Sequence, residues 1–187
     1  PDIPFWRLPD PEVIDPAVSI LQDNLTPLIE TAPAVLDFAP HRAKIKAQDP
    51  MLLIFTSGTT GLPKAAVYSH LRWLCSGDVM EVTIDATPED VYYCCLPLYH
   101  GAAATSVTST ALASGGAIFV RRKFSVSKFW DEIVEHNVTV VQYIGEICRY
   151  LLAKSKAPSK HSLRAMMGAG LTDKTWQQWL DTFGQVD

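Results

Sequence analysis

Thr56-Ser57-Gly58-Thr59-Thr60-Gly61-Leu62-Pro63-Lys64 is a polar, glycine-bearing stretch between two apolar runs, 51–55 and 65–68. The runs predict two strands, and the stretch between them predicts a flexible loop. Glycine lacks a Cβ, so the backbone can take left-handed angles and approach a ligand closely. Successive backbone N–H groups in such a turn form an anion-binding nest, and hydroxyl and lysine side chains add donors suited to phosphate. We therefore expect a phosphate-binding loop.

This loop differs from the two common phosphate motifs. A P-loop requires four residues between its first glycine and Gly-Lys-Ser/Thr. Here Gly58 and Gly61 are three positions apart, and Ala65 follows Lys64. The sequence also contains no G-x-G-x-x-G dinucleotide fingerprint. The structural alternative is an ordinary surface turn, but such turns rarely combine these residues without an acidic one.

Composition restricts the class of protein. The chain has 187 residues, 48% of them apolar, and a formal net charge of −4, so it can build a core. No basic block is present, which argues against nucleic acid as a partner. The four cysteines and five histidines show no metal-ligand spacing, and we expect no metal site in these residues and reduced thiols in an intracellular protein. The sequence shows no signal peptide and no apolar run of the ~20 residues that span a bilayer.

The order of predicted elements indicates the fold class. Residues 1–50 are proline-rich and predict a connecting segment with at most a short helix or turn in 16–29; residues 51–187 form the main domain. The expected strands are 51–55, 65–68, 91–96, 117–120, 138–143 and 163–167, and the expected helices are 70–80, 102–113, 125–134, 145–152 and 172–183. Such alternation predicts an α/β fold with a largely parallel sheet. Ligands then bind at the carboxyl ends of the strands, here the loops after Phe55, Leu96, Tyr143 and Met167.

Several local signals define the helices. We expect Ser69, Ser125 and Thr172 to cap three of them. The helix after Ser69 has Leu71, Leu74 and Cys75 on one face. The helix after Ser125 follows the amphipathic pattern, with the apolar positions Val126, Phe129, Trp130, Ile133 and Val134. Adjacent Cys94 and Cys95 should point to opposite faces of their strand.

The nine-residue loop, together with Leu53 three positions before it, resembles the ATP-binding signature of the adenylate-forming enzymes. These enzymes include acyl-CoA synthetases, luciferases and the adenylation domains of peptide synthetases. The resemblance implies that residues 51–187 are part of their α/β N-terminal domain. It also implies catalytic roles for Lys64 and Thr60, and contacts to the nucleotide from Thr56, Ser57, Gly58, Thr59, Thr60, Gly61 and Lys64.

Two further segments are similar to segments of that family. Pro97-Leu98-Tyr99-His100 resembles a Pro-Leu-aromatic-His segment that lines the acyl pocket, which implies a substrate contact for His100. The turn Gly168-Ala169-Gly170 is similar to one beside the adenine and the acyl group, and becomes a second part of the nucleotide site. The generic alternatives are an isolated surface or core histidine and a tight connection between a strand and a helix.

The region from Phe124 to Gly184 resembles the fatty acid transport proteins, also called very-long-chain acyl-CoA synthetases. The similarity lies in Phe129-Trp130, in Val140-Val141-Gln142-Tyr143-Ile144-Gly145-Glu146 and in Arg149-Tyr150-Leu151. It implies that Tyr143 and Gly145 border the acyl site, that ATP, Mg²⁺ and CoA take part, and that a fatty acid is converted to its acyl-adenylate and then to acyl-CoA. It also implies association with a membrane of the endoplasmic reticulum, peroxisome or plasma membrane through regions outside this chain.

Some motifs of the family do not occur in the sequence. Its Tyr-Gly-x-Thr-Glu motif, whose glutamate helps hold Mg²⁺, would follow Asp187. We therefore expect a truncated adenylation domain that is inactive alone. Two alternatives stay open: a non-catalytic module that binds nucleotide or acyl ligands, and an enzyme that adenylates an aromatic or amino acid.

Overall fold

The computed structural model describes residues 6–7, 23–24, 26–32, 42–56, 61–184 and 186. The chain divides into two compact units, residues 1–45 and 46–187. In the first unit, strand β1 (Trp6–Arg7) pairs in parallel with β2 (Asp23–Asn24), and helix α1 spans Thr26–Thr31. Most of the short helix or turn expected in 16–29 lies outside the described residues; its last residues fall in α1.

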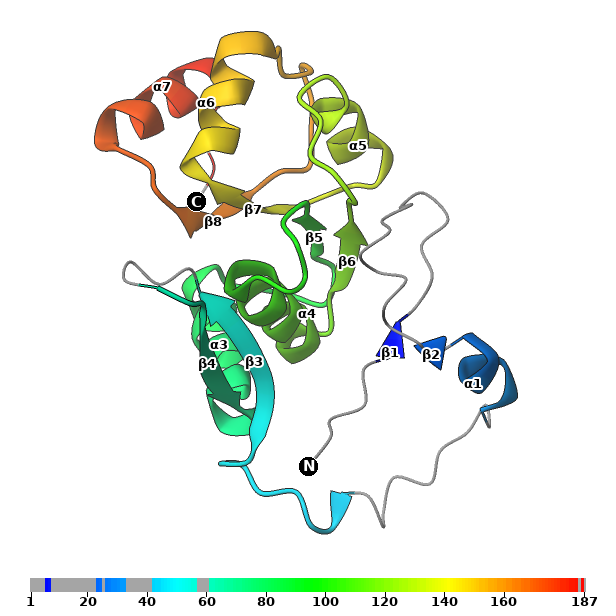
Figure 1. The fold of residues 1–187 in the computed structure, drawn as a ribbon. Coiled ribbons are helices and arrows are strands. Elements are labelled where there is room, and N and C mark those ends of the chain that lie inside the picture. Colours follow the sequence, from blue (N-terminus) through cyan, green and yellow to red (C-terminus); the bar gives the residue numbers. More distant parts are fainter. Residues whose placement is uncertain are drawn as a thin grey trace. The chain divides into compact units, whose positions relative to one another are not determined.

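A four-strand parallel sheet forms the centre of the second unit (Figure 1). Its strands are β5 (Val91–Cys94), β6 (Ala117–Val120), β7 (Val140–Ile144) and β8 (Ala165–Ala169), in the order β6-β5-β7-β8. Each adjacent pair is parallel. The predicted α/β class and parallel sheet are confirmed, with three of the four strands shifted or shortened by one or two residues at their ends.

Helices cover both faces of this sheet. They are α3 (His70–Thr83), the π-helix η2 (Ala102–Val107), α4 (Thr108–Ser114), α5 (Phe129–Glu135), α6 (Gly145–Lys154) and α7 (Asp173–Phe183). In Figure 1, α5, α6 and α7 lie on one side of the strands, and α3 and α4 lie on the other. The unit is therefore a three-layer α/β/α arrangement, the usual way to bury both faces of a parallel sheet.

Two hydrophobic cores follow from the alternation of side chains along β5. Tyr93 and Cys95 point into the core beneath α5, α6 and α7, which also contains Phe129 and Trp179. Tyr92 and Cys94 point into the core beneath η2 and α4. The expected opposite orientation of Cys94 and Cys95 is confirmed. Burial raises the pKa of the Cys95 thiol to about 12, so this group stays protonated and unreactive.

The capping predictions divide into two confirmed and one wrong. The Ser69 hydroxyl accepts a hydrogen bond from the Arg72 N–H, and the Thr172 hydroxyl accepts one from the Thr175 N–H. Ser69 therefore caps α3 and Thr172 caps α7, as expected. Ser125 does not cap α5. Its hydroxyl contacts Ser127, and the helix begins at Phe129 after a turn in which the Phe129 N–H donates to the Ser125 carbonyl.

The buried faces of two helices are not set by hydrophobicity alone. Leu71, Leu74 and Cys75 are exposed on α3, and Trp73 and Gly77 face the core instead. A Cβ on Gly77 would lie 2.6 Å from the carbonyl oxygen of Ser109, so the contact with α4 requires a glycine.

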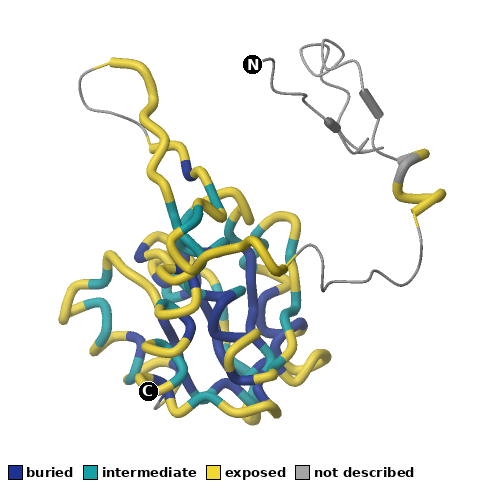
Figure 2. The backbone as a smooth tube through the Cα atoms, turned by 90° about the horizontal axis from the view of Figure 1, so that it is seen from below, coloured by how far each residue is buried: buried dark blue, intermediate teal, exposed yellow. Residues whose placement is uncertain are grey.

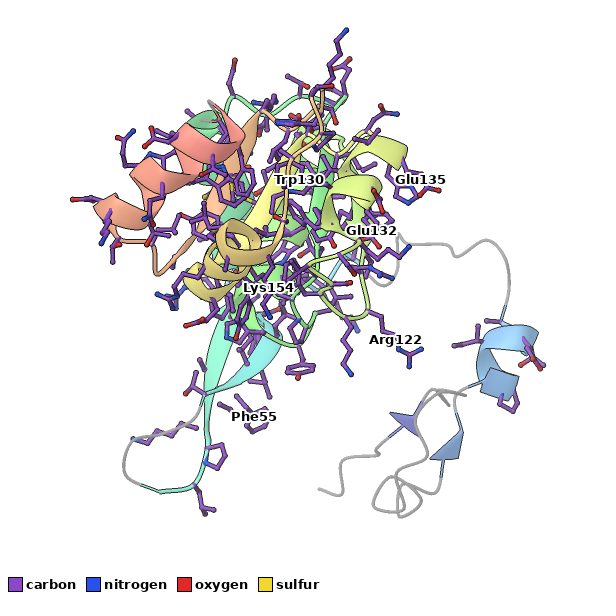
Figure 3. The ribbon with its side chains drawn as sticks, turned by 90° about the horizontal axis from the view of Figure 1, so that it is seen from above. Phe55, Arg122, Trp130, Glu132, Glu135 and Lys154 are labelled. Atoms are coloured by element: carbon purple, nitrogen blue, oxygen red, sulfur yellow. The ribbon has the colours of Figure 1, made fainter. Side chains whose placement is uncertain are left out.

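On α5 the predicted stripe is buried at Phe129, Trp130 and Ile133, but Val134 is 47% exposed. The polar residue Glu132 is buried in its place. It accepts a hydrogen bond from the Tyr93 hydroxyl at 2.8 Å and pairs with Arg121 at 2.9 Å. In Figure 3, Trp130 and Glu132 lie toward the body of the unit, and Glu135 lies at its outer side. The hydrophobic pattern of the sequence cannot predict that an acidic residue is buried in an ion pair.

A polar cluster joins the amino ends of three strands. Asp90 precedes β5, Thr139 precedes β7 and Arg164 precedes β8. The Asp90 carboxylate accepts hydrogen bonds from the Arg164 Nε at 2.9 Å, the Thr139 hydroxyl at 2.7 Å and the Thr87 N–H at 2.8 Å. Burial opposes the charge of Asp90, but these bonds and the Arg164 charge lower its pKa from 3.8 to about 2. This cluster fixes the edge of the sheet that faces away from the strand carboxyl ends.

The other sheet of this unit is an antiparallel hairpin of β3 (Pro50–Thr56) and β4 (Lys64–Ser69). The two strands are as predicted, but they lie outside the parallel sheet. Its apolar residues Leu53, Phe55 and Val67 are 60%, 70% and 53% exposed, and they share one face because Leu53 pairs with Val67. Figure 2 shows the hairpin mainly in the exposed colour, while buried positions gather in the body of the unit. Within the described parts of the chain, no helix combines the length and apolarity needed to cross a membrane.

Candidate functional site

A cavity of about 290 Å³ lies at the carboxyl ends of β7 and β8, beside the loop that follows β5. Of the residues expected at the site from sequence, it brings together His100, Tyr143, Gly168 and Ala169. These residues come from three loops or strand ends that are distant in sequence and adjacent in the sheet. The position agrees with the rule that ligands of parallel sheets bind at the carboxyl edge.

His100 is held at the mouth of η2. Its backbone N–H donates to the Pro97 carbonyl at 2.9 Å, and its ring Nδ1 accepts from the Ala102 N–H at 3.2 Å. An Nδ1 that accepts this bond carries no proton, so the neutral ring carries its proton on Nε2. The side chain is exposed and lies on the cavity wall. His100 therefore offers a hydrogen-bond donor at Nε2 to a ligand there.

The ends of β7 and β8 approach so closely that glycine is required. A Cβ on Gly168 would lie 2.2 Å from the Tyr143 carbonyl oxygen, and one on Gly145 would lie 2.0 Å from the Gly170 carbonyl oxygen. Gly170 has φ of +84°. Gly145 and Gly170 thus pack against each other at the start of α6, and neither is among the residues that line the cavity.

Tyr143 borders the cavity at the end of β7, but its side chain packs against the core beneath α5, α6 and α7, beside Leu171 and Trp176. Burial, followed by the charge of the neighbouring Cys148, raises the pKa of its hydroxyl. The phenol therefore stays protonated near neutral pH.

The residues of the phosphate loop that the structure describes lie on the hairpin. Thr56 pairs with Lys64 across the hairpin, and the Thr56 hydroxyl donates to the Lys64 carbonyl at 3.3 Å. Gly61 has φ of +147°. Thr56, Gly61 and Lys64 are all exposed, and none of them lines the cavity. The other expected loop residues, Ser57, Gly58, Thr59 and Thr60, lie outside the described residues.

The base of the hairpin contacts the loop that carries His100. Ile54 of β3 is 7% exposed, and its Cδ1 lies 3.7 Å from the position that a Cβ on Gly101 would take. This contact places β3 next to the residue that follows His100, but the structure does not bring Lys64 to the cavity wall.

Sequence patterns did not identify six residues of the cavity wall: Met80, Ala102, Ser106, Gln142, Ile144 and Met167. Ala102 and Ser106 belong to a small-residue run that predicted close packing, and the strand pattern covered Gln142 without singling it out. The π-helix η2, whose wider turn carries Ala102 and Ser106, has no local sequence signature. Such segments frequently occur at functional sites.

The chemistry of the cavity is mainly apolar, with a few hydrogen-bonding groups. Methionine, alanine and isoleucine residues form much of the wall, and His100, Ser106 and Gln142 are its polar residues. Such a lining suits an uncharged or hydrocarbon group that polar contacts hold in one orientation. Within the described ranges, no group of three or more His, Cys, Asp or Glu is arranged to hold a metal ion.

The comparison with known families identifies the class. The sequence model of the AMP-binding enzyme family matches residues 8–187, and the chain belongs to this family. The α/β unit with its parallel sheet has the fold of two solved structures, with TM-scores of 0.73 and 0.75.

Two curated proteins are similar to this chain in sequence. The chain is 39% identical over 183 residues to long-chain fatty acid transport protein 1 of Bos taurus, covering 97% of this chain and 26% of that protein. It is 41% identical over 143 residues to the medium/long-chain-fatty-acid–CoA ligase FadD6 of Mycobacterium tuberculosis, covering 75% of this chain and 24% of that one.

A solved structure has the same arrangement. The crystal structure of ATP-bound MatB from Rhodopseudomonas palustris matches with a TM-score of 0.67 and 26% identity, over 83% of this chain and 30% of that one. The chain thus spans about a quarter of the length of the two curated relatives.

Proposed function

We propose that this chain is part of an AMP-forming acid–CoA ligase that activates a long-chain or very-long-chain fatty acid. The observation that carries the proposal is the mainly apolar cavity at the carboxyl edge of the sheet. The similarity to a fatty acid transport protein and a fatty-acid–CoA ligase supports the same substrate class. A hydrocarbon chain gains roughly 0.8 kcal/mol for each CH₂ that it buries in such a wall.

The proposed reaction has two steps. A carboxylate oxygen of the acid attacks the α-phosphorus of ATP, which gives an acyl-adenylate and releases pyrophosphate. The CoA thiol then attacks the acyl carbon and displaces AMP. The first step needs no general base because the attacking carboxylate is already an anion. Catalysis then depends mainly on positioning and charge stabilisation.

In this proposal the two regions of the second unit divide the work. Lys64 and Thr60, with the neighbouring loop residues Thr56–Gly61, hold the β- and γ-phosphates as they become the leaving group. His100, Tyr143 and the turn Gly168-Ala169-Gly170 contact the acyl group and the nucleotide base, and Gly145 borders the acyl site. Mg²⁺ supplies further charge neutralisation when bound.

The same reaction would give the protein a role in fatty acid uptake, and the two parts of the chain would have different tasks. Conversion of the fatty acid to its CoA thioester would draw fatty acid into the cell, with membrane association through regions outside this chain. Residues 51–187 would carry the chemistry, and residues 1–50 would connect them to the rest of the protein.

The alternatives differ in what the cavity and loop would do. A truncated, non-catalytic module would bind nucleotide or acyl ligands without turnover. An enzyme for an aromatic or amino acid would keep the phosphate loop and fill the cavity with a different side group.

ATP–pyrophosphate exchange with palmitate tests the proposal. It should be run on the 187-residue chain beside a version extended through its natural C-terminus. We expect exchange in the extended form and none in the short one, because the short one lacks the Tyr-Gly-x-Thr-Glu motif. Exchange in neither form contradicts the fatty acid assignment; repeating the assay with aromatic and amino acids then separates a different substrate from a binding module.

A further inference from the structure

Gln142 is a buried amide in the wall of the cavity. It is 3% exposed and lies on β7 between Val141, which belongs to one hydrophobic core, and Tyr143. Side chains alternate along a strand, so Gln142 shares the face of Val140, toward η2. A polar side chain in such a position costs free energy unless its donors and acceptors are paired.

The orientation of the amide follows from its one partner. Its Nε2 donates to the Ala102 carbonyl at 2.7 Å. The flipped amide would set Oε1 against the same carbonyl, placing two acceptors together, so the hydrogen bond fixes which atom is which. Oε1 is buried and has no hydrogen-bond partner among the described residues.

An unpaired buried acceptor of this kind calls for a donor, and Gln142 is one of the residues that line the cavity. The ionised carboxylate of a fatty acid cannot serve, because it only accepts hydrogen bonds. A plain methylene chain cannot serve either. A hydroxyl group can donate to Oε1 while the rest of the chain contacts the apolar wall.

We propose that Gln142 is a specificity-determining residue whose Oε1 accepts a hydrogen bond from a hydroxyl group on the hydrocarbon chain of the acid. The site then favours a hydroxylated long-chain acid over the unsubstituted acid of equal length. A site that pairs with a substrate hydroxyl discriminates against the analogue that lacks it, because its own polar group is left unpaired. This inference rests on the proposed function and names the substrate class for the same site.

The test compares two acids on one protein. In the full-length protein, kcat/KM is measured for stearate and for a panel of its positional hydroxy isomers, with wild type and with Gln142→Met. Methionine has nearly the same length and no amide acceptor. We expect at least one isomer to exceed stearate by about tenfold in wild type, and the ratio to fall to about one in Gln142→Met. A general loss of folding or activity lowers kcat/KM for the hydroxy isomer and for stearate alike, so it leaves their ratio unchanged.

Ser106→Ala is the matched control, since it removes another neutral polar group from the same wall. We expect it to keep the preference. The inference is overturned if no hydroxy isomer is preferred by wild type, if the ratio is unchanged in Gln142→Met, or if the ratio falls only in Ser106→Ala. A higher KM for ATP in Gln142→Met with an unchanged acid ratio assigns Oε1 to the nucleotide and also overturns it.

The proposed function fails separately, if wild type activates neither stearate nor any hydroxy isomer. Activation of stearate without a preference leaves the ligase assignment intact and refutes the role of Gln142. Should Gln142→Met not fold, Gln142→Leu replaces it, and the wild-type panel tests the preference without any variant.

Discussion

The β3–β4 hairpin and the four-strand sheet lie in one compact unit but differ in burial. Tyr92, Tyr93 and Val141 of the sheet are fully buried, whereas Leu53 and Phe55 of the hairpin are 60% and 70% exposed (Figures 2 and 3). The sheet is held by cores on both faces, and the hairpin contributes Ile54 to the buried residues. Stability is therefore concentrated in the sheet, while the residues expected to bind phosphate are displayed on a strand pair with little burial.

The largest effect should come from the polar cluster at the amino edge of the sheet. Asp90→Ala removes the acceptor of Arg164 and leaves its charge unpaired next to the core. We expect the free energy of unfolding to fall by about 3–5 kcal/mol, measured by urea unfolding of the full-length protein. Glu89→Ala, at the exposed neighbouring position, is the control and should change it by less than about 0.5 kcal/mol. Equal effects would show that the Asp90 cluster does not stabilise the sheet.

The close approach at the carboxyl edge gives the next effect. Gly145→Ala places a methyl group 2.0 Å from the Gly170 carbonyl oxygen, so the backbone of β8 or α6 must move. We expect a loss of roughly 1–3 kcal/mol. Gly101→Ala is the matched control, because Gly101 has φ of −51° and its added Cβ meets Ile54 at an ordinary 3.7 Å. A similar melting temperature for both variants would contradict the packing described here.

Acid should weaken the sheet through Asp90. Because its pKa is lower in the folded protein, the stability that it contributes is present above the ordinary value of 3.8 and is lost as the pH falls toward about 2. The size of the shift corresponds to about 2 kcal/mol. The difference in unfolding free energy between wild type and Asp90→Asn should therefore shrink over that window. A constant difference from pH 3.8 to about 2 would argue against the lowered pKa.

The smallest effect should be on the hairpin. Phe55→Ala removes an aromatic side chain that is 70% exposed, and we expect a change of less than about 0.5 kcal/mol. Phe129→Ala removes the same side chain from a fully buried position and should cost about 3–5 kcal/mol. Thermal unfolding of the two variants measures the contrast. A comparable loss in both would mean that something covers the hairpin face.

The sequence predicted most of the regular structure, because local signals specify it. Alternating apolar runs predicted the strands, and Ser69 and Thr172 identified two helix starts. Gly115 and Gly184, both with positive φ, end two helices. The Ser125 cap failed because α5 begins only at Phe129, after a turn, and the Ser125 hydroxyl contacts Ser127. Close packing at Gly77, rather than hydrophobicity, decides which side of α3 is buried.

The site was predictable only in part. Strand-end positions and family resemblance led to His100, Tyr143, Gly168 and Ala169, which do line one cavity. Gln142 was missed because a polar residue within an apolar strand gives no signal of its partner, which lies 40 positions away at Ala102. Asp90 and Arg164 were missed for the same reason, since they are 74 positions apart. The four central loop residues, Ser57, Gly58, Thr59 and Thr60, lie outside the described residues and stay a prediction.

The contrast between hairpin and sheet is tested most directly by measuring the two half-reactions separately in Lys64→Ala of the full-length protein. Lys64 is exposed, so its removal should leave the melting temperature unchanged. We expect formation of the acyl-adenylate to slow by about 100-fold or more, and thioester formation from the preformed adenylate to change only a few-fold. Equal loss in both half-reactions, or a loss of folding stability instead, would contradict the assignment of the hairpin to phosphate binding.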